Sequence, residues 1–362
     1  MYLKKLIISN FKNITEAEAE FSSKLNCITG NNGSGKTNLL DSVYYLSMTK
    51  SYFSNLDQQN ISYEKDYAVL RGEYSREDNS IESISVSLGR GGEKHIKRNS
   101  KSYQKLSDHI GLIPIVMVSP YDTCLINESG EERRKFINSI ISQMDKEYLR
   151  RVQNYNHLLQ QRNKYLKESN VSNDLLDTFT DRLSHNATYI YEKRAAFTEK
   201  LLPITKKYYN LLSEGKELID IIYKSDLEGG SLGDLLKKCE SRDKMFKYTT
   251  AGIQRDDLIF LMNDHPFRIS GSQGQQKTFL ISLKLAQFEI MRQMHGKAPI
   301  MLLDDVFDKL DMLRVESLLN MVSSDFFGQI FITDSNKVRV DGILDKINGN
   351  SKSFDIVSGR LL

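Results

Sequence analysis

Residues 30–37 read GNNGSGKT, a glycine-rich pattern that ends in lysine and threonine. It matches the phosphate-binding loop G-x-x-x-x-G-K-[ST] and stands between an apolar stretch, LNCIT, and a sequence of helical periodicity. Glycines let backbone N–H groups close around phosphate oxygens, and the following helix N-terminus adds partial positive charge. Lys36 is expected to reach the β and γ phosphates, and the Thr37 hydroxyl to ligate Mg²⁺. The predicted ATP-binding residues are Gly30, Asn31, Asn32, Gly33, Ser34, Gly35, Lys36 and Thr37.

Two adjacent carboxylates, Asp304 and Asp305, follow a second apolar stretch at residues 300–303. Unpaired charges at the tip of a buried strand are costly, so a bound cation would explain them. Asp304 is predicted to contact Mg²⁺, and Asp305 to orient the water that attacks the γ-phosphate. Lys36 and Asp305 are then the catalytic residues. Two acids alone also suit a solvated strand end, and the phosphate loop upstream is what favours the metal.

The stretch SGSQGQQKTFL, residues 270–280, places serine, glycine and glutamine before an apolar helical run. It resembles the Ser-x-Gly-Gln element with which ABC-type ATPases bind the γ-phosphate of a nucleotide held by the opposite subunit. Hydroxyl, amides and a helix N-terminus together form a neutral cradle for an anion. The residues expected to act in trans are Ser272, Gly274 and Gln275. The element therefore predicts a homodimer with ATP between the protomers.

A basic run, KHIKRNSKSYQK at residues 94–105, contains no acid. Such a run can contact the phosphates of DNA, or it can be the solvated face of a hairpin. The sequence leaves both interpretations open. The candidate DNA-binding residues are Lys94, Lys97, Arg98, Lys101 and Lys105.

Composition describes an ordinary soluble protein. The chain has 362 residues, of which 40% are hydrophobic and 27% charged, and its net charge is +3. This length suits one large domain or two ordinary ones. Cys27, Cys124 and Cys239 fit neither zinc spacing nor a disulfide framework. Neither a signal peptide nor a run of 18 apolar residues is recognisable, so we expect a cytoplasmic protein.

The order of expected elements indicates an α/β architecture. Short alternating stretches between residues 66 and 98 predict antiparallel sheet. Residues 121–240 predict several long helices, which can form a packing arm or a partner surface. Residues 1–120 and 241–362 would then form an ABC-type ATPase head, or P-loop lobe, with an inserted helical lobe at 121–240. The insertion holds further basic residues at Arg133, Arg134, Lys135, Arg150 and Arg151.

With these motifs in order, the chain resembles the RecF family of bacterial recombinational repair ATPases over essentially its whole length. PYDTCLI and ERRKFIN are similar to the family's Pro-Glu-Asp and Arg-Arg-x-Phe-Leu-Asp elements. TAGIQRDDL resembles its Gly-Pro-His-Arg-Asp-Asp-Leu element, and SQGQQK its ABC signature. DDVFDKLD resembles its Walker B strand and the dimer loop that follows.

Some positions depart from the family pattern and bear on the dimer interface and on DNA contacts. They are Phe53 for arginine, Tyr121 for an acid, Gly130 for proline, Ile253 and Gln254 for Pro-His, and Asp308 and Lys309 for Ser-Glu. The phosphate loop, both Walker B acids and the signature residues are intact.

The resemblance implies ATP and Mg²⁺ as cofactors, ATP-dependent dimerisation, and weak DNA-dependent ATP hydrolysis at composite dimer sites. It further implies binding to gapped, single-stranded or duplex DNA. It implies action with RecO and RecR in loading recombinase at single-strand gaps, and a part in the SOS response.

Other classes of function share parts of this pattern. Nucleotide-binding subunits of ABC transporters usually carry a histidine after the strand that follows Walker B, where this chain has Thr333, Asp334 and Ser335. Structural SMC-like ATPases have long coiled-coil arms, but the insertion is short and lacks sustained heptads. An SMC-like or ABC-type ATPase without a DNA role stays an alternative, which a DNA-binding assay would distinguish.

Overall fold

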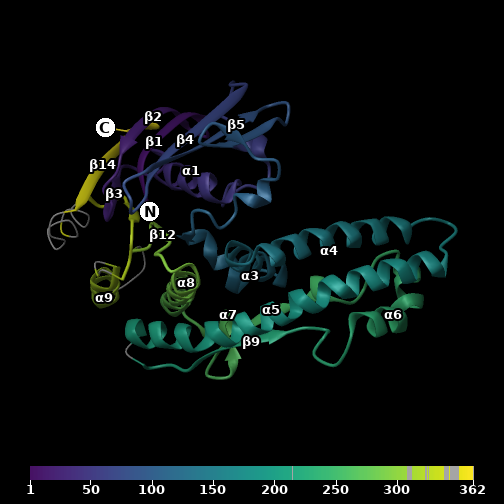
Figure 1. Ribbon diagram of the computed structural model, residues 1–362. Helices are drawn as coiled ribbons and strands as arrows, with labels where there is room; N and C mark the ends of the chain where they lie inside the picture. Colours follow the sequence, from purple (N-terminus) through teal and green to yellow (C-terminus); the bar gives the residue numbers. More distant parts are fainter. Residues whose placement is uncertain are drawn as a thin grey trace. The chain divides into compact units, whose positions relative to one another are not determined.

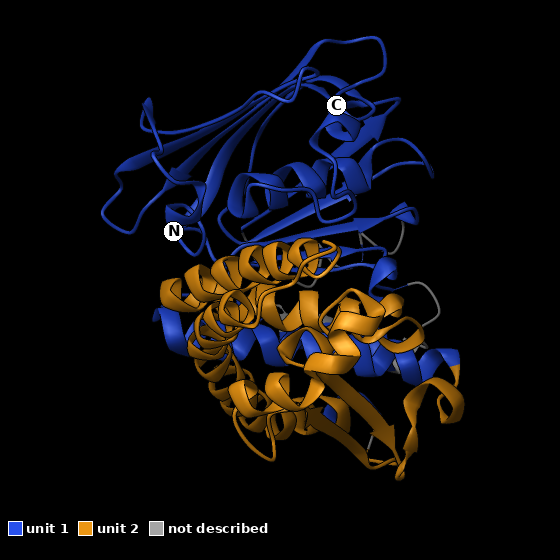
Figure 2. Cartoon of the chain, turned by 90° about the vertical axis from the view of Figure 1, so that its right-hand side faces the viewer, with its two compact units in different colours: residues 1–122, 211–213, 273–362 blue, residues 123–210, 214–272 orange. Residues whose placement is uncertain are grey.

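The computed structural model describes residues 1–213, 215–307, 312–322, 324, 326–337, 342 and 350–361 (Figure 1). The chain divides into two compact units (Figure 2). Unit 1 comprises residues 1–122, 211–213 and 273–362, and unit 2 comprises residues 123–210 and 214–272. Unit 2 is therefore an insertion into unit 1. The expected boundary at residue 240 falls inside helix α6 (Leu232–Phe246), and unit 2 continues to Ser272.

An antiparallel sheet forms one layer of unit 1, with strand order β2-β1-β4-β5-β6-β7. The strands are β1 (Tyr2–Phe11), β2 (Ile14–Glu20), β4 (Tyr67–Ser75), β5 (Ile81–Gly89), β6 (Lys94–Arg98) and β7 (Lys101–Ser102). Alternate residues of β5 are buried, among them Ile84, Val86 and Leu88, because successive side chains of a strand point to opposite faces. This confirms the antiparallel sheet predicted from the alternating stretches.

A second sheet of unit 1 has the order β15-β14-β3-β13-β12-β8. Its strands are β3 (Leu25–Thr29), β8 (Ile115–Val118), β12 (Ile300–Asp304), β13 (Ile330–Asp334), β14 (Ser351–Val357) and β15 (Arg360–Leu361). β14, β3, β13, β12 and β8 pair in parallel. β3, β12 and β13 are buried throughout, as expected of parallel strands covered on both faces. Parallel pairing brings the phosphate loop after β3 and the acids at the carboxyl end of β12 to one edge of the sheet.

Helix α1 (Lys36–Met48) is buried on all sides from Leu39 onward. It packs against strands of both sheets, and Leu40, Val43 and Leu46 belong to the main hydrophobic core. Because α1 is held by this packing, Lys36 and Thr37 in its first turn have a defined position in the phosphate loop. Unit 1 also contains α8 (Gln273–His295) and α9 (Met312–Val322).

Unit 2 is mainly helical. Its helices are α2 (Cys124–Asn127), α3 (Gly130–Met144), α4 (Lys146–Tyr165), α5 (Asn173–Ser213, whose last three residues group with unit 1), α6 (Leu232–Phe246) and α7 (Phe267–Ser270). Short 3₁₀ turns lie at Asp57–Asn60, Leu106–Asp108 and Pro120–Thr123 in unit 1 or at its boundary, and at Ile253–Arg255 (η4) in unit 2.

Unit 2 also contains a small three-stranded sheet. The order is β11-β10-β9, from β9 (Ile219–Lys224), β10 (Asp257–Met262) and β11 (His265–Pro266). β9 lies where only helices were expected, and β10 belongs to unit 2, although its sequence lies in the stretch assigned to the ATPase lobe. The two strands pair antiparallel, and Ile219 and Ile221 of β9 are buried. In the part of the chain that the structure describes, no helix is long and apolar enough to span a membrane.

Candidate functional site

The phosphate loop connects the carboxyl end of β3 to α1 through backbone that requires glycine. Gly30 has φ 147° and Gly35 has φ 118°, where residues with a Cβ are strained. A Cβ on Gly30 would lie 2.4 Å from the carbonyl oxygen of Ile356. The first and last glycines of the motif are therefore required by the local fold.

Polar groups inside the loop point toward the place that phosphate oxygens would occupy. Lys36 is 4% exposed, and its ammonium donates to the carbonyl oxygens of Gly30 at 2.7 Å and Asn31 at 3.2 Å. The Ser34 hydroxyl is buried and has no hydrogen-bond partner among the described residues. Buried polar groups normally find partners, so an oxyanion in the loop would complete this set.

Thr37 and Asp304 meet at the end of the loop. The Thr37 hydroxyl lies 3.0 Å from each carboxylate oxygen of Asp304, and the Thr333 hydroxyl donates to Asp304 Oδ1 at 2.7 Å. Burial raises the pKa of Asp304, and the hydrogen bonds from Thr333 and Thr37 oppose that rise. Hydroxyl and carboxylate oxygens are the ligands that Mg²⁺ prefers, so this pair fits the predicted metal contact.

Asp305 is half-buried and has a backbone φ of 45°, in the left-handed region. Its backbone N–H donates to the Thr333 hydroxyl at 3.1 Å, and its carbonyl accepts from Lys277 at 3.2 Å. These two bonds hold the strand end in a conformation that is unusual for a residue with a Cβ. Thr333 thus positions both acids, a role that sequence reasoning missed. The signal that could have revealed this role is the polar Thr333 in the otherwise apolar stretch IFIT, which becomes β13 and pairs with β12.

Two turns from distant parts of unit 1 brace the loop. Asn13, between β1 and β2, donates to the carbonyl oxygen of Gly33 at 3.0 Å and accepts from the Asn38 amide at 2.7 Å. Gly359, between β14 and β15, donates its backbone N–H to the Ser34 carbonyl at 2.8 Å. No motif spacing pointed to these residues, because the contacts join segments that are remote in sequence.

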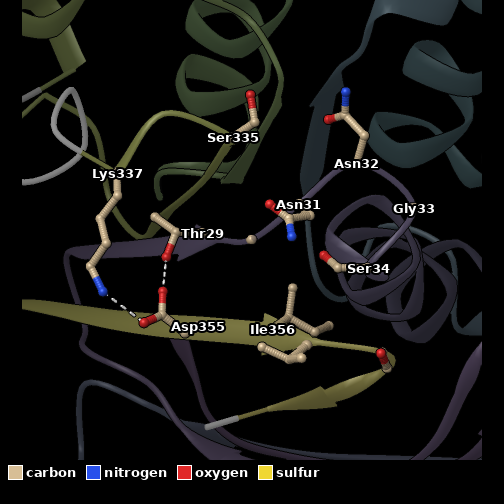
Figure 3. Close-up of a pocket in the computed structure, with 12 residues that line it drawn as sticks. Thr29, Asn31, Asn32, Gly33, Ser34, Ser335, Lys337, Asp355 and Ile356 are labelled. Atoms are coloured by element: carbon tan, nitrogen blue, oxygen red, sulfur yellow. Dashed lines mark hydrogen bonds and ion pairs between the residues drawn. The ribbon is translucent and has the colours of Figure 1, made fainter.

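A pocket of about 480 Å³ opens beside the loop. It is lined by loop residues, by the end of β13 and by β14, and Figure 3 shows Ser335, Lys337 and Asp355 around it together with Asn31 and Ser34. Asp355 accepts from the Thr29 hydroxyl and from Lys337, the latter at 2.8 Å. The hydrogen bond from Lys337 is the main cause that lowers the pKa of Asp355. Lys337 and Asp355 therefore form an ion pair in the wall of the pocket.

The signature element lies at the start of α8. Ser272 is exposed and directly precedes the helix, whereas Gly274 and Gln275 lie half-buried in its first turn. The division between the units falls between Ser272 and Gln273. The predicted dimer-loop departures, Asp308 and Lys309, lie outside the described residues.

Two departures from the family pattern contact each other in unit 1. The rings of Phe53 and Tyr121 meet edge to face with centroids 6.2 Å apart. Tyr52 packs against both rings. An aromatic cluster therefore occupies the positions where the resemblance led us to expect an arginine and an acid.

The structure separates the basic run into two groups. Lys94 bonds to Thr49 and to Asp57, the latter at 2.9 Å, and Arg98 pairs with the buried Glu82. Lys97, Lys101 and Lys105 are exposed. Strand alternation explains the separation along β6, because its even-numbered residues face the protein. Lys94 and Arg98 are thus engaged in ion pairs within unit 1, and the exposed lysines are the remaining DNA-binding candidates of this run.

Comparison with known proteins identifies the family. The RecF/RecN/SMC N terminal domain family matches residues 2–352. DNA replication and repair protein RecF of Bacteroides fragilis YCH46 is 44% identical over 362 residues, covering 100% of this chain and 98% of the relative. RecF of Azobacteroides pseudotrichonymphae is 46% identical over 363 residues, covering 100% and 99%.

Solved structures agree with this assignment. The recombination mediator protein RecF with ATP, of the RecFOR pathway, superimposes with a TM-score of 0.90 at 30% identity, covering 100% of this chain and 97% of that one. An Smc head domain of Pyrococcus furiosus with an extended coiled coil has a TM-score of 0.58 at 16% identity, covering 99% and 95%, and shares the fold. The fold is thus the ABC-ATPase head with an inserted helical lobe, and the chain belongs to the RecF family.

Proposed function

We propose that this protein is an ATP-dependent DNA-binding ATPase of recombinational repair and replication. Its relatives are named DNA replication and repair proteins, and a solved relative contains ATP. ATP would bind at the loop of residues 30–37, next to the pocket beside β13 and β14. The same site would also suit the alternative, an ATPase without a DNA role, but the names of the relatives favour a role in DNA repair.

The observation that carries the proposal is the contact between Thr37 and Asp304. These residues are 267 positions apart, yet the hydroxyl lies 3.0 Å from the carboxylate at the mouth of the loop. Thr37 and Asp304 would hold Mg²⁺ together with phosphate oxygens. Bound there, the ion would neutralise charge on the phosphates during transfer. The partly exposed Asp305 would orient water, and Lys36 would contact the γ-phosphate.

Hydrolysis in this proposal needs two copies of the chain. Ser272, Gly274 and Gln275 of one protomer would bind the γ-phosphate held by the loop of the other. Support comes from the exposed position of Ser272 at the start of a long helix, whose N-terminus carries the partial positive charge that favours an anion. Turnover would be slow, because closure of the dimer would limit its rate. Turnover would also depend on DNA.

DNA, RecR and RecO are the proposed partners, in the cytoplasm, in loading recombinase at single-strand gaps and in the SOS response. The name of the RecFOR pathway attached to a relative supports the protein partners. On the chain itself, Lys97, Lys101 and Lys105 are exposed and carry the positive charge that DNA phosphates attract.

One experiment tests the whole proposal. Binding of duplex and gapped DNA is measured by fluorescence anisotropy without nucleotide, with ADP, and with a slowly hydrolysed ATP analogue, each with Mg²⁺. We expect the ATP analogue to tighten DNA binding and ADP not to. ATP binding without any DNA binding would favour the alternative ATPase, and absence of ATP binding would remove the site itself.

A further inference from the structure

Unit 2 contains a polar cavity whose residues take no part in the proposed ATP site. The cavity has a volume of about 270 Å³ and is lined by residues of α3, α4, α5 and the turn η4. Its polar lining includes Arg134, Asn138, Asn156, Arg194 and Gln254. Every lining residue belongs to unit 2, so the cavity is a feature of that unit alone.

Beside the cavity, ion pairs join both α3 and α5 to the segment at residues 256–257. Arg133 of α3 donates to both carboxylate oxygens of Asp257, at 2.7 and 2.9 Å. Arg194 of α5 is buried and pairs with the buried Asp256 at 2.5 Å. Arg133 also bonds to the carbonyls of Leu125 and Glu128. Both carboxylates therefore already have a guanidinium partner.

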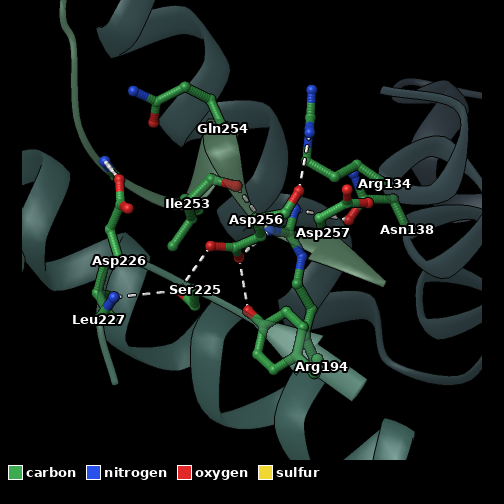
Figure 4. A network of polar contacts seen from close by, with 12 residues as sticks. Arg134, Asn138, Arg194, Ser225, Asp226, Leu227, Ile253, Gln254, Asp256 and Asp257 are labelled. Carbon is green, nitrogen blue, oxygen red and sulfur yellow. Dashed lines mark hydrogen bonds and ion pairs between the residues drawn. The ribbon is translucent and has the colours of Figure 1, made fainter. Parts of the chain in front are cut away.

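Arg134 is the third guanidinium of this network, and among the described residues no carboxylate forms an ion pair with it. Among the described residues it makes one side-chain hydrogen bond, to the backbone carbonyl of Asp256 at 2.8 Å (Figure 4). Burial, and then the charge of Arg194, lower the pKa of Arg134, and the charges of Asp257, Glu131 and Asp256 oppose this shift. The cavity's own acid, Glu131, bonds Lys135 at 3.0 Å. Lys135 also pairs with Glu132 at 2.7 Å. Arg134 is thus the guanidinium of the cavity wall that has no paired carboxylate among the described residues.

The amides around Arg134 add hydrogen-bond donors. Asn138 Oδ1 accepts from Tyr148 at 2.5 Å and from Arg194 at 3.0 Å, which turns the carbonyl side of this amide toward those donors. Its NH₂ group is then available to the cavity. Asn156 lines the cavity from α4, so donors approach from two helices. A half-buried guanidinium without a carboxylate is costly, and an anion in the cavity would offset that cost.

We propose that this cavity binds a phosphate group, separate from the ATP site. A guanidinium offers a planar fork of donors that matches phosphate oxygens, and it keeps its charge at all working pH values. Donors that arrive from different helices suit a tetrahedral oxyanion better than a planar carboxylate. The phosphate belongs either to a free phosphate ion or to a nucleic acid, and the two sources share this chemistry.

The first arm of the test uses inorganic phosphate and the full chain. It is done in a Lys36→Ala background, so that phosphate bound at the ATP loop does not contribute. Thermal unfolding is followed while phosphate replaces chloride at constant ionic strength. Phosphate should raise the Tm, and adding Arg134→Gln should weaken this apparent affinity by about tenfold, the scale of one charge-assisted hydrogen bond. Arg150→Gln, which removes an exposed arginine paired with Glu147 on α4, is the matched control and should change nothing.

The second arm measures duplex DNA binding at several salt concentrations, with Lys36 intact. If the phosphate belongs to nucleic acid, Arg134→Gln weakens binding and reduces the salt slope by about one, while Arg150→Gln does not. A free phosphate ion is the source if only the first arm responds. The inference is wrong if Arg134→Gln and Arg150→Gln behave alike in both arms. Arg134→Lys, which keeps the charge but not the fork, replaces the glutamine variant if that one does not fold, with intermediate weakening expected. ATP binding by the wild type is measured in parallel, so a failure of the proposed ATP site is seen separately.

Discussion

Thr37 Oγ1 lies 3.0 Å from both carboxylate oxygens of Asp304, although the two residues are 267 positions apart. Thr37 lies in the first turn of α1 and Asp304 is the last residue of β12, so the contact depends on the parallel sheet and on the buried helix together. A second threonine, Thr333, fixes the carboxylate from β13. The two motifs of the candidate site are therefore in direct contact, and the role of each residue can be tested separately.

Lys36→Ala is expected to weaken ATP binding strongly. Lys36 is the one cation within the loop sequence, and its ammonium is held among loop carbonyls 2.7 and 3.2 Å away. Its loss removes charge-assisted bonds to phosphate, each worth about 1.5–3 kcal/mol. Isothermal titration calorimetry measures the change. Wild-type affinity in the variant would mean that ATP binds elsewhere.

Asp305→Asn is expected to slow ATP turnover by about 10²-fold or more while ATP binding persists. Asparagine nearly preserves the size of the side chain, and the two bonds made by the Asp305 backbone do not need its carboxylate. Asp304→Asn serves as the contrasting variant, because it should lower Mg²⁺-dependent ATP binding itself. Single-turnover hydrolysis and calorimetry separate the two effects. Unchanged turnover with lost affinity in Asp305→Asn would reverse the assigned roles.

Ser272→Arg is expected to block ATP-dependent dimerisation and leave ATP binding by the monomer nearly intact. Ser272 is exposed at the start of α8, so an arginine there adds bulk and charge at the proposed interface without filling a core position. Light scattering with ATP reads the oligomeric state. The control is Ser172→Arg, which makes the same change in an exposed loop between α4 and α5. A Ser272→Arg protein that still dimerises like the wild type would exclude the sandwich.

Reversing the exposed lysines Lys97 and Lys101 to glutamate is expected to weaken DNA binding and to flatten its salt dependence by up to about two in log–log slope. Arg98 is left unchanged because it pairs with the buried Glu82, and its replacement would disturb the sheet. Lys237→Glu with Lys238→Glu, exposed in unit 2, makes the same change in net charge. If both double variants show the same salt slope, the basic run is a solvated hairpin.

His109 is expected to make stability fall as pH is lowered. It is buried and bonds to the Leu46 carbonyl and the Tyr103 hydroxyl. Burial is the main cause that lowers the pKa of His109, the bond to Leu46 opposes this shift, and the smaller effects of Arg98 and Glu82 have opposite signs. The unfolded chain therefore binds a proton near pH 6.5 that the folded chain resists, and stability is lost below that pH.

Between about pH 7.5 and pH 5.5 this residue should cost at most about 1.4 kcal/mol of unfolding free energy. Urea unfolding at the two pH values measures the difference, and His109→Gln should remove it. His157→Gln, at an exposed position on α4, is the control and should retain it. Equal pH dependence in wild type and His109→Gln would assign the loss to other groups.

Continuous motifs were readable from the sequence because their chemistry is local. GNNGSGKT predicted a loop, and the structure places it between β3 and α1. IMLLDD predicted a strand that ends in acids, which is β12. The basic run was readable as charge but not as orientation, since Lys94 and Arg98 take part in ion pairs that only the strand register reveals.

Contacts between remote segments were not readable. Asn13 and Gly359 brace the loop from turns that carry no motif, and Thr333 supports both acids from a neighbouring strand. β9 was missed because its short alternation lies between long helices and gains its partner, β10, only in the folded unit. These features depend on which strands become neighbours in the folded protein, and the motifs in the sequence do not specify that.

The pairing of β3 has a consequence for how the protein is made. Residues 25–29 pair with residues 330–334 and 351–355, and the loop is braced by Gly359. Since a ribosome adds roughly 5–20 residues per second, the start of the site waits on the order of tens of seconds for its neighbours. During that time β3 has open edges, which chaperones and proteases can recognise. A nucleotide bound at this loop would stabilise the folded site only after β13 and β14 have been translated and have paired with β3.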